Sequence, residues 1–167
     1  PVIGYVGRLT RDKGIPELVI AFQRVRRHYR EAQLLLVGEL DETDPLPLET
    51  REVIERDPAI VKTGFVQDPW AYYRVMTVAV FPTHREGLLT PEPAIAQVPV
   101  VATRATGVVD WVSDGVTGLL VPVGDVDALA AAIERLLEAP DLAARLADAA
   151  YARIMSELHP ERIWDQT

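Results

Sequence analysis

The sequence predicts an α/β fold built on a doubly wound, open parallel sheet, and three observations predict it. Short runs rich in Val, Ile and Leu alternate along the chain with longer amphipathic segments. Most of the short runs lack a polar–apolar alternation, which is typical of strands covered on both faces. The 167 residues, 49% hydrophobic and 25% charged, have the size and composition of one ordinary globular domain.

Strands are expected where β-branched and other apolar residues cluster. The predicted strands are Val2–Val6, Gln33–Val37, Ile60–Thr63, Val78–Phe81, Val98–Ala102 and Gly118–Val121. Because helical segments separate these strands, we expect right-handed crossovers and a parallel sheet. The chain has no internal repeat, linker or low-complexity stretch, so we read it as a single domain.

The segments between the strands carry helical signals. In the first of them, Leu18, Phe22 and Val25 share one face at helical spacing. The predicted helices are Ile15–Arg30, Leu46–Glu55, Pro69–Met76, Pro91–Gln97, Val108–Asp114, Asp125–Ala139 and Asp141–Glu157.

Composition excludes several classes of function. The formal net charge of −8 argues against general nucleic-acid binding, because such domains are usually basic. The chain has no cysteine, which excludes disulfides and thiolate metal sites and leaves the cytoplasm as the default location. No apolar run approaches the roughly 18 residues that a membrane span needs.

A basic stretch late in the first predicted helix has two interpretations. It consists of Arg24, Arg26, Arg27, His28 and Arg30. Such residues are usually a solvated face placed favourably near a helix C-terminus. The alternative is a peripheral contact of the full-length protein with the anionic inner face of a membrane.

The loop after the first predicted strand has features of a phosphate site. Ligands of open parallel sheets bind beyond the carboxyl ends of the strands. This loop offers Gly7 and Gly14 for close backbone approach, carries Arg8, Arg11 and Lys13, and leads into a helix N-terminus. Its order matches neither a P-loop nor a G-x-G-x-x-G fingerprint. On spacing alone, a diphosphate site and an ordinary solvated turn both stay open.

The loop after the fourth predicted strand contains two carboxylates around a glycine turn. Glu86 precedes Gly87, and Glu92 stands in the first turn of the following helix. Carboxylates accept hydrogen bonds from vicinal diols, so a sugar or a ribose is a natural ligand. The alternative makes Glu92 a helix-start charge favoured by the dipole and Glu86 a surface residue.

Three motifs then follow one another along the chain. They are G-R-L-x-x-x-K-G at Gly7–Gly14, P-V-V-A-T at Pro99–Thr103 and D-G-V-T-G-L-L-V at Asp114–Val121. In this order they resemble the C-terminal domain of family 4 glycosyltransferases, and the resemblance covers essentially the whole chain. Those enzymes have the two-domain GT-B architecture, in which each half is Rossmann-like.

The resemblance implies a function and a domain organisation. Residues 1–167 would form the donor-binding half of a retaining, metal-independent glycosyltransferase without a cofactor. The donor would be a nucleoside diphosphate sugar, with UDP or GDP, from which a hexose is transferred to an acceptor. The acceptor-binding N-terminal domain would be missing, so we expect this chain alone to be inactive.

The resemblance also implies roles for individual residues. Arg8 and Lys13 would bind the donor diphosphate, and Glu92 the donor ribose. Glu86 would be catalytic, touching the donor sugar and stabilising charge in the transition state. Further donor contacts would come from Gly7, from backbone amides of Gly87, Leu88, Leu89 and Thr90, and from Phe65 and Val66 beside the nucleobase.

Three features depart from the family pattern. Five residues separate Glu86 from Glu92, whereas the family usually has seven, so the site is altered or two residues of the turn are missing. Pro93 stands where alanine is usual, and Gln97 replaces a glycine. These departures keep two alternatives open: a nucleotide-sugar epimerase of the same architecture, and a degenerate, non-catalytic nucleotide-binding domain.

The chain contains one Asp-x-Asp sequence, Asp125-Val126-Asp127. It opens a predicted helix rather than following a strand, as a metal-holding pair would. We therefore interpret Asp125 as an N-cap and Asp127 as a neighbour favoured by the helix dipole, and we expect no metal site.

Overall fold

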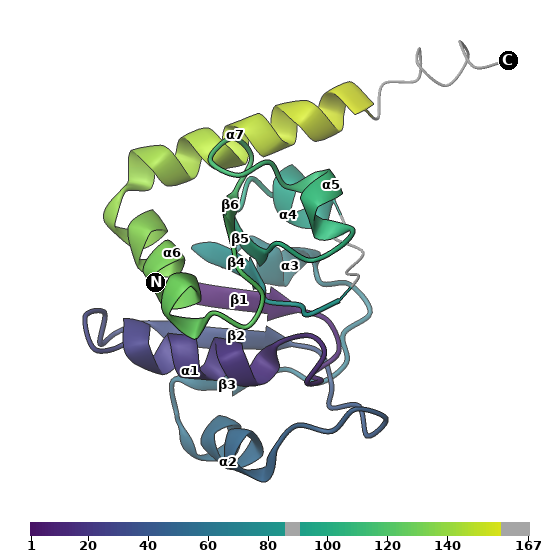
Figure 1. The fold of residues 1–167 in the computed structure, drawn as a ribbon, viewed down its shortest axis with the longest axis vertical. Coiled ribbons are helices and arrows are strands. Elements are labelled where there is room, and N and C mark those ends of the chain that lie inside the picture. The colour runs from purple at the N-terminus through teal and green to yellow at the C-terminus, as the bar shows by residue number, and fades with distance from the viewer. Residues whose placement is uncertain (86–90, 158–167) are drawn as a thin grey trace, which may run out of the picture.

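The structure, a computed structural model, describes residues 1–85 and 91–157, and in this part of the chain six strands form one parallel sheet (Figure 1). The strands are β1 (Val2–Val6), β2 (Gln33–Val37), β3 (Ile60–Lys62), β4 (Val78–Phe81), β5 (Val100–Thr103) and β6 (Leu119–Val121). Their order is β3-β2-β1-β4-β5-β6, so the direction of winding reverses at β1. The predicted doubly wound α/β fold is confirmed.

The predicted strands are all present, and β1, β2 and β4 have the predicted bounds. The fifth strand begins at Val100 rather than at Val98. Proline has no N–H for the ladder, so Pro99 contributes only its carbonyl, which accepts a hydrogen bond from the backbone N–H of Ala79 at 2.9 Å. Regular pairing therefore starts after this proline.

Each predicted helix is also present, although several are shorter than expected. The helices are α1 (Ile15–Val25), α2 (Leu48–Arg56), α3 (Trp70–Tyr73), α4 (Glu92–Ile95), α5 (Val108–Trp111), α6 (Val126–Glu138) and α7 (Pro140–Glu157). The N-cap prediction for α6 is confirmed, since the Asp125 carboxylate accepts a hydrogen bond from the backbone N–H of Ala128 at 2.8 Å.

The prediction that the first helix extends to Arg30 is wrong, because α1 ends at Val25. None of residues 26–30 is fully buried, and only Tyr29 among their apolar side chains packs against the core, so little apolar contact supports a longer helix. Beyond it the backbone forms tight turns, with the N–H of His28 donating to the carbonyl of Val25 at 3.0 Å. The basic residues after Val25 tolerate a helix well, which misled the sequence interpretation.

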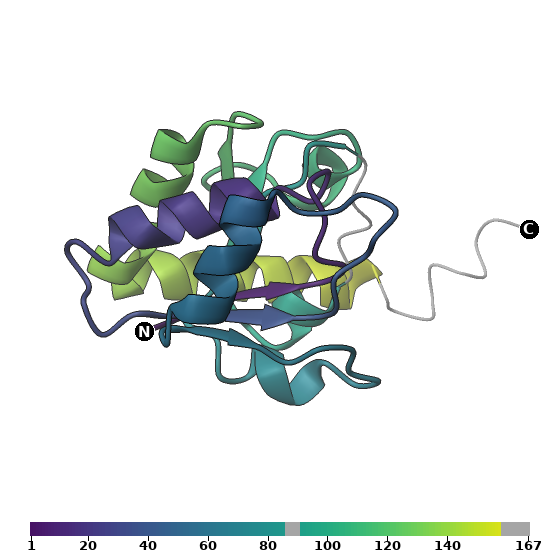
Figure 2. The same cartoon turned by 90° about the horizontal axis from the view of Figure 1, so that it is seen from below.

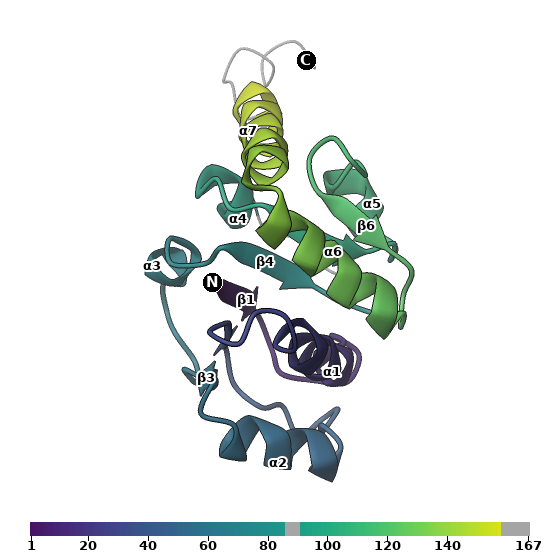
Figure 3. The ribbon, with the colours of Figure 1, turned by 90° about the vertical axis from the view of Figure 1, so that its left-hand side faces the viewer.

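Apolar side chains from both layers of helices sandwich the sheet. Helices α1 and α6 pack together over one face, where Phe22, Leu18 and Ile133 are fully buried. Tyr73 and Val108 belong to a second buried cluster. Figure 3 shows α1 and α3 on opposite sides of β1. The nearly continuous burial of the strands follows from this double cover.

Side chains of the basic stretch meet carboxylates from other helices. Arg24 pairs with Asp127 at the start of α6, and the Arg26 guanidinium lies 3.0 Å from the carboxylate of Asp57. His28 Nδ1 lies 2.7 Å from Glu134 Oε1. Three of the five basic residues thus have a carboxylate partner, while Arg27, His28 and Arg30 are exposed, as expected of a solvated face.

Two departures from the family pattern have a local structural explanation. Gln97 has φ +54°, the left-handed conformation in which glycine carries no steric penalty. Its side-chain Nε2 donates to Asp148 Oδ1 on α7 at 2.9 Å. Pro93 is the second residue of α4, where a missing N–H leaves no helical hydrogen bond unmade.

Candidate functional site

Three loops meet at the carboxyl edge of the sheet, where the strand order reverses. Open parallel sheets bind ligands at this point. Figure 2 shows the loops after β1 and β2 together on this side of the molecule. The loop after β4 joins them, because the N–H of His84 donates to the carbonyl of Asp12 at 2.8 Å. The N–H of Leu9 donates to the carbonyl of Glu39 at 2.9 Å.

Gly14 brings the first loop against the end of β4. Its φ is +72°, and a Cβ atom there would lie 2.0 Å from the carbonyl oxygen of Pro82. No side chain fits at that distance, so only glycine allows this approach. The contact places the N-terminus of α1 beside the loop that follows β4.

Tyr5, a buried residue of β1, holds the first loop in place through its hydroxyl group. Its hydroxyl donates to the carbonyl oxygen of Arg8 at 2.9 Å. Burial raises the pKa of the Tyr5 phenol, so it remains a hydrogen-bond donor at ordinary pH. A Cβ atom on Gly7 would lie 2.6 Å from the same hydroxyl. Gly7 thus has a packing reason to be glycine, besides the donor contact that the resemblance implies.

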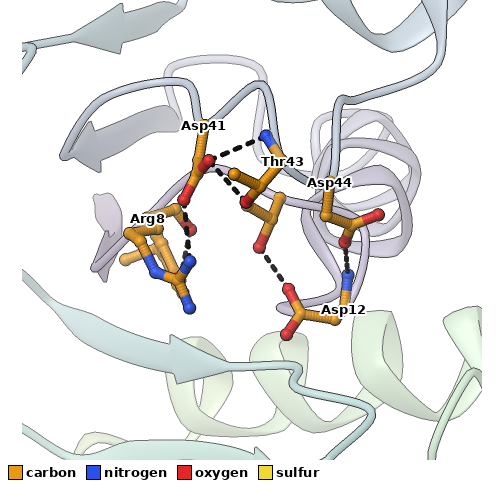
Figure 4. Close-up of polar contacts among 7 residues, drawn as sticks. Arg8, Asp12, Asp41, Thr43 and Asp44 are labelled. Carbon is orange, nitrogen blue, oxygen red and sulfur yellow. Dashed lines mark hydrogen bonds and ion pairs between the residues drawn. The ribbon is translucent and has the colours of Figure 1, made fainter.

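Arg8 is held by a carboxylate that sequence reasoning missed. Its Nη1 donates to Asp41 Oδ2 at 2.7 Å, while 58% of the Arg8 side chain stays exposed (Figure 4). The other Asp41 oxygen accepts from the backbone N–H of Thr43 at 2.9 Å and from its hydroxyl at 2.6 Å. These bonds from Thr43, and then the Arg8 guanidinium, lower the pKa of Asp41 to about 2.

A second carboxylate of the same loop holds the next part of the first loop. Asp44 accepts a hydrogen bond from the backbone N–H of Asp12 at 2.7 Å and one from Arg11 Nε at 2.9 Å. The Asp12 N–H is the main reason that the pKa of Asp44 is lowered. Arg11, to which the resemblance assigns no donor contact, is ion-paired here, with 61% of its side chain exposed. The acidic run D-E-T-D, which begins four residues after the predicted strand ends at Val37, was the available signal for both carboxylates.

The lowered pKa of Asp41 predicts how the stability of the fold changes at acid pH. Because folding lowers this pKa, the ionised carboxylate stabilises the fold above the unfolded-state pKa of about 4. This contribution is lost as the pH falls from about 4 towards 2. We therefore expect the free energy of unfolding to fall more steeply over this range in the wild type than in Asp41→Asn. Urea unfolding at several pH values measures both slopes, and parallel slopes would contradict the prediction.

The structure places some of the predicted site residues and leaves others outside its description. Lys13 lies half-buried directly before Gly14, and Glu92 is the first residue of α4. Phe65, in the predicted nucleobase loop, is 73% exposed, whereas Val66 packs against the second buried cluster. The positions predicted for Glu86, Gly87, Leu88, Leu89 and Thr90 lie outside the described residues.

An open hollow of about 650 Å³ lies beside the first loop. It is lined by Arg11, Asp12, Pro16, Glu17, Asp44, Pro47, His84 and Arg85. Two of these lining residues contact each other, since His84 Nε2 lies 2.7 Å from Glu17 Oε1. Arginine side chains that donate hydrogen bonds and carboxylates that accept them both line this hollow. Hydroxyl groups can donate and accept, so such a lining suits a ligand rich in hydroxyl groups better than an anion that can only accept.

Neither a cluster of metal ligands nor a membrane-spanning helix is found among the described residues. Across 1–85 and 91–157, no three His, Cys, Asp or Glu side chains gather as a metal site requires. Asp125 and Asp127 are engaged by the α6 cap and by Arg24. Within the same ranges, none of the helices has the length and apolar character of a membrane span.

Comparison with known proteins gives consistent matches. Residues 1–139 match the family described as Glycosyl transferases group 1. The capsular polysaccharide biosynthesis glycosyltransferase CapM of Staphylococcus aureus is 35% identical over 167 residues, which cover 99% of this chain and 44% of CapM. A glycogen synthase of Mycobacterium tuberculosis is 33% identical over 160 residues, covering 92% of this chain and 38% of that protein.

Solved structures show the same fold. Anabaena Alr3699/HepE in complex with UDP superposes with a TM-score of 0.86 at 25% identity, covering 99% of this chain and 46% of that one. Sucrose-phosphate synthase from Thermosynechococcus elongatus superposes with a TM-score of 0.83 at 34% identity, covering 98% and 42%. The chain therefore spans less than half the length of these relatives.

Proposed function

The chain belongs to the group 1 family of glycosyl transferases, and from this we propose that it is the donor-binding domain of a glycosyltransferase. The proposed reaction transfers a hexose from a nucleoside diphosphate sugar to an acceptor, with retention of anomeric configuration. The proposed ligand roles are those that the resemblance implies: Arg8 and Lys13 on the diphosphate, and Glu92 on the ribose. Glu86 is the proposed catalytic carboxylate.

One observation carries the proposal: the loop with Arg8 and Lys13 lies at the point where the strand order reverses. There it runs into the N-terminus of α1, whose backbone N–H groups and dipole favour an anion. Arg8 offers a planar fork for phosphate oxygens and Lys13 a point charge. The mixed-charge hollow beside this loop suits the hydroxyl groups of a sugar.

A UDP-sugar is the favoured donor, with a GDP-sugar as the alternative. The Anabaena protein, 25% identical to this chain, was crystallised with UDP and with UDP-glucose. Phe65, which is 73% exposed, is available to stack on a base. Base stacking tolerates different bases, so Phe65 by itself does not select uracil.

We also propose that the activity is metal-independent and needs a second domain. Cations and helix dipoles would stabilise the leaving diphosphate. The other domain would bind the acceptor and hold it at the donor, so the 167-residue chain alone is expected to transfer no sugar. Arg24 and Arg26 each contact a carboxylate, whereas Arg27 and Arg30 are exposed, and a peripheral membrane contact of the full-length protein remains the alternative role of this stretch.

Calorimetric titration with UDP tests donor binding directly. We expect the 167-residue chain to bind UDP with the same affinity in EDTA and in magnesium or manganese. UDP binding that disappears in EDTA and returns with the metal would refute the proposal that donor binding is metal-independent. No heat of binding under either condition would refute donor binding itself and leave a degenerate domain, which the short Glu86–Glu92 turn favours.

A further inference from the structure

The contact between Asp41 and Arg8 joins two loops that follow neighbouring strands. The residues are 33 positions apart in sequence, and the loops lie at the carboxyl edge of β1 and β2. In the parallel register, Val6 pairs with Val37, so both loops leave the sheet at the same level. This placement lets a short side chain after β2 reach the side chain of Arg8 after β1.

Asp41 is fixed independently of Arg8. Its Oδ1 is occupied by the two bonds from Thr43, one from the backbone and one from the hydroxyl (Figure 4). The remaining oxygen, Oδ2, faces Arg8 Nη1 at 2.7 Å. Only 21% of the Asp41 side chain is exposed, against 58% for Arg8. The carboxylate is thus the more constrained partner and the arginine the more exposed one.

Two opposite effects of Asp41 on an anionic ligand must be compared. Its negative charge lowers the positive potential at Arg8, and a phosphate bound there would lie within the Debye length of about 8 Å, so salt weakens this repulsion without removing it. Its hydrogen bond orders a long side chain that would otherwise lose rotamer freedom when it binds phosphate. The Asp41 charge is already compensated by the two bonds from Thr43 and by Arg8 itself, so we expect ordering to outweigh the remaining repulsion.

We propose that Asp41 is a positioning residue, which orders the Arg8 guanidinium for the donor diphosphate. This inference rests on the proposed function, because it assigns Arg8 a phosphate ligand. The Arg8 guanidinium has five N–H donors, and only Nη1 is used in the hydrogen bond to Asp41. With the guanidinium held at Nη1, its other N–H groups can donate to phosphate oxygens.

The variant Asp41→Asn tests the role with little change in shape. The amide oxygen can keep the bonds from Thr43, but the amide NH₂ then faces Arg8 Nη1, and two donors cannot bond. At 150 mM salt we expect UDP to bind roughly threefold to tenfold more weakly and uridine to bind unchanged. Thermal unfolding at pH 7 checks that the variant is folded.

A double-mutant cycle separates positioning from a general structural effect. In the Arg8→Ala background, Asp41→Asn should cause no further loss of UDP affinity, because no guanidinium remains to be ordered. Glu42→Gln is the matched control: it removes one negative charge next in sequence, from a carboxylate 3.0 Å from Arg51, and should leave UDP affinity unchanged.

A ligand-free measurement gives an independent result. Nitrogen-15 relaxation of the Arg8 Nε, assigned by its loss in Arg8→Ala, should show larger motion in Asp41→Asn than in the wild type or Glu42→Gln. Unchanged UDP affinity in Asp41→Asn, or an equal loss with and without Arg8, would overturn the positioning role. Tighter binding would overturn it too, showing that Asp41 competes with the diphosphate. A wild type that binds no UDP would instead refute the proposed function, and the inference with it.

Discussion

Replacing Arg8 or Lys13 by alanine is expected to weaken UDP binding by roughly tenfold to a hundredfold. Each side chain would make a charge-assisted hydrogen bond to the diphosphate, which typically contributes about 1.5–3 kcal/mol. Uridine has no phosphate, so both variants should bind it almost as the wild type does. Calorimetry with the two ligands measures this difference for each variant.

Two further variants make the comparison specific. Glu92→Ala should weaken UDP and uridine alike, because its proposed partner is the ribose. Arg56→Ala is the control, since it also removes one exposed arginine, but one that pairs with Glu52 on α2 and does not line the hollow beside the first loop. It should keep nearly full UDP affinity. Equal losses of uridine and UDP in Arg8→Ala would show that the phosphate role belongs elsewhere.

Replacing Gly14 by alanine should have the largest effect on stability. At φ +72° a left-handed conformation costs a residue with a Cβ about 1–2 kcal/mol. The new Cβ would also lie 2.0 Å from the Pro82 carbonyl oxygen, and relief of such a clash adds roughly 1–3 kcal/mol or more. Urea unfolding measures the total, and UDP binding should also fall because Lys13 and the start of α1 shift.

Gly115 provides the control for this prediction. Its φ is also +72°, but a Cβ atom added there meets nothing within 4 Å. Gly115→Ala should therefore show the conformational cost alone, about 1–2 kcal/mol, and leave UDP binding unchanged. If the two variants lose the same stability, then the chain relaxes around Gly14 and close packing against Pro82 does not explain the glycine.

Patterns of a few neighbouring residues were enough to predict those helices and strands that depend on local sequence. Strands β1, β2 and β4 have the predicted bounds because each is a run of apolar residues covered on both faces. Asp125 was identified as an N-cap because the cap bond spans only three residues. The family resemblance rests on motifs of the same local kind, and the match over residues 1–139 confirms it.

The end of α1 shows where local reasoning failed. Residues 26–30 suit a helix by propensity, but the helix ends where its buried face ends. The partners of the cationic side chains near this end could not be predicted either, because they lie far away in sequence. Arg24, for example, pairs with Asp127, which is 103 residues away. Propensity describes a residue alone, whereas burial and ion pairing depend on the elements packed against it.

The sequence by itself determined the fold class, the order of strands and helices, and the family, because these depend on periodicity and motif order along the chain. Only the tertiary structure decided how the site loop is held. Asp41 reaches Arg8, and Gly14 approaches Pro82, because parallel pairing brings the carboxyl ends of β1, β2 and β4 to one edge. Such contacts depend on distances between segments that no local pattern records.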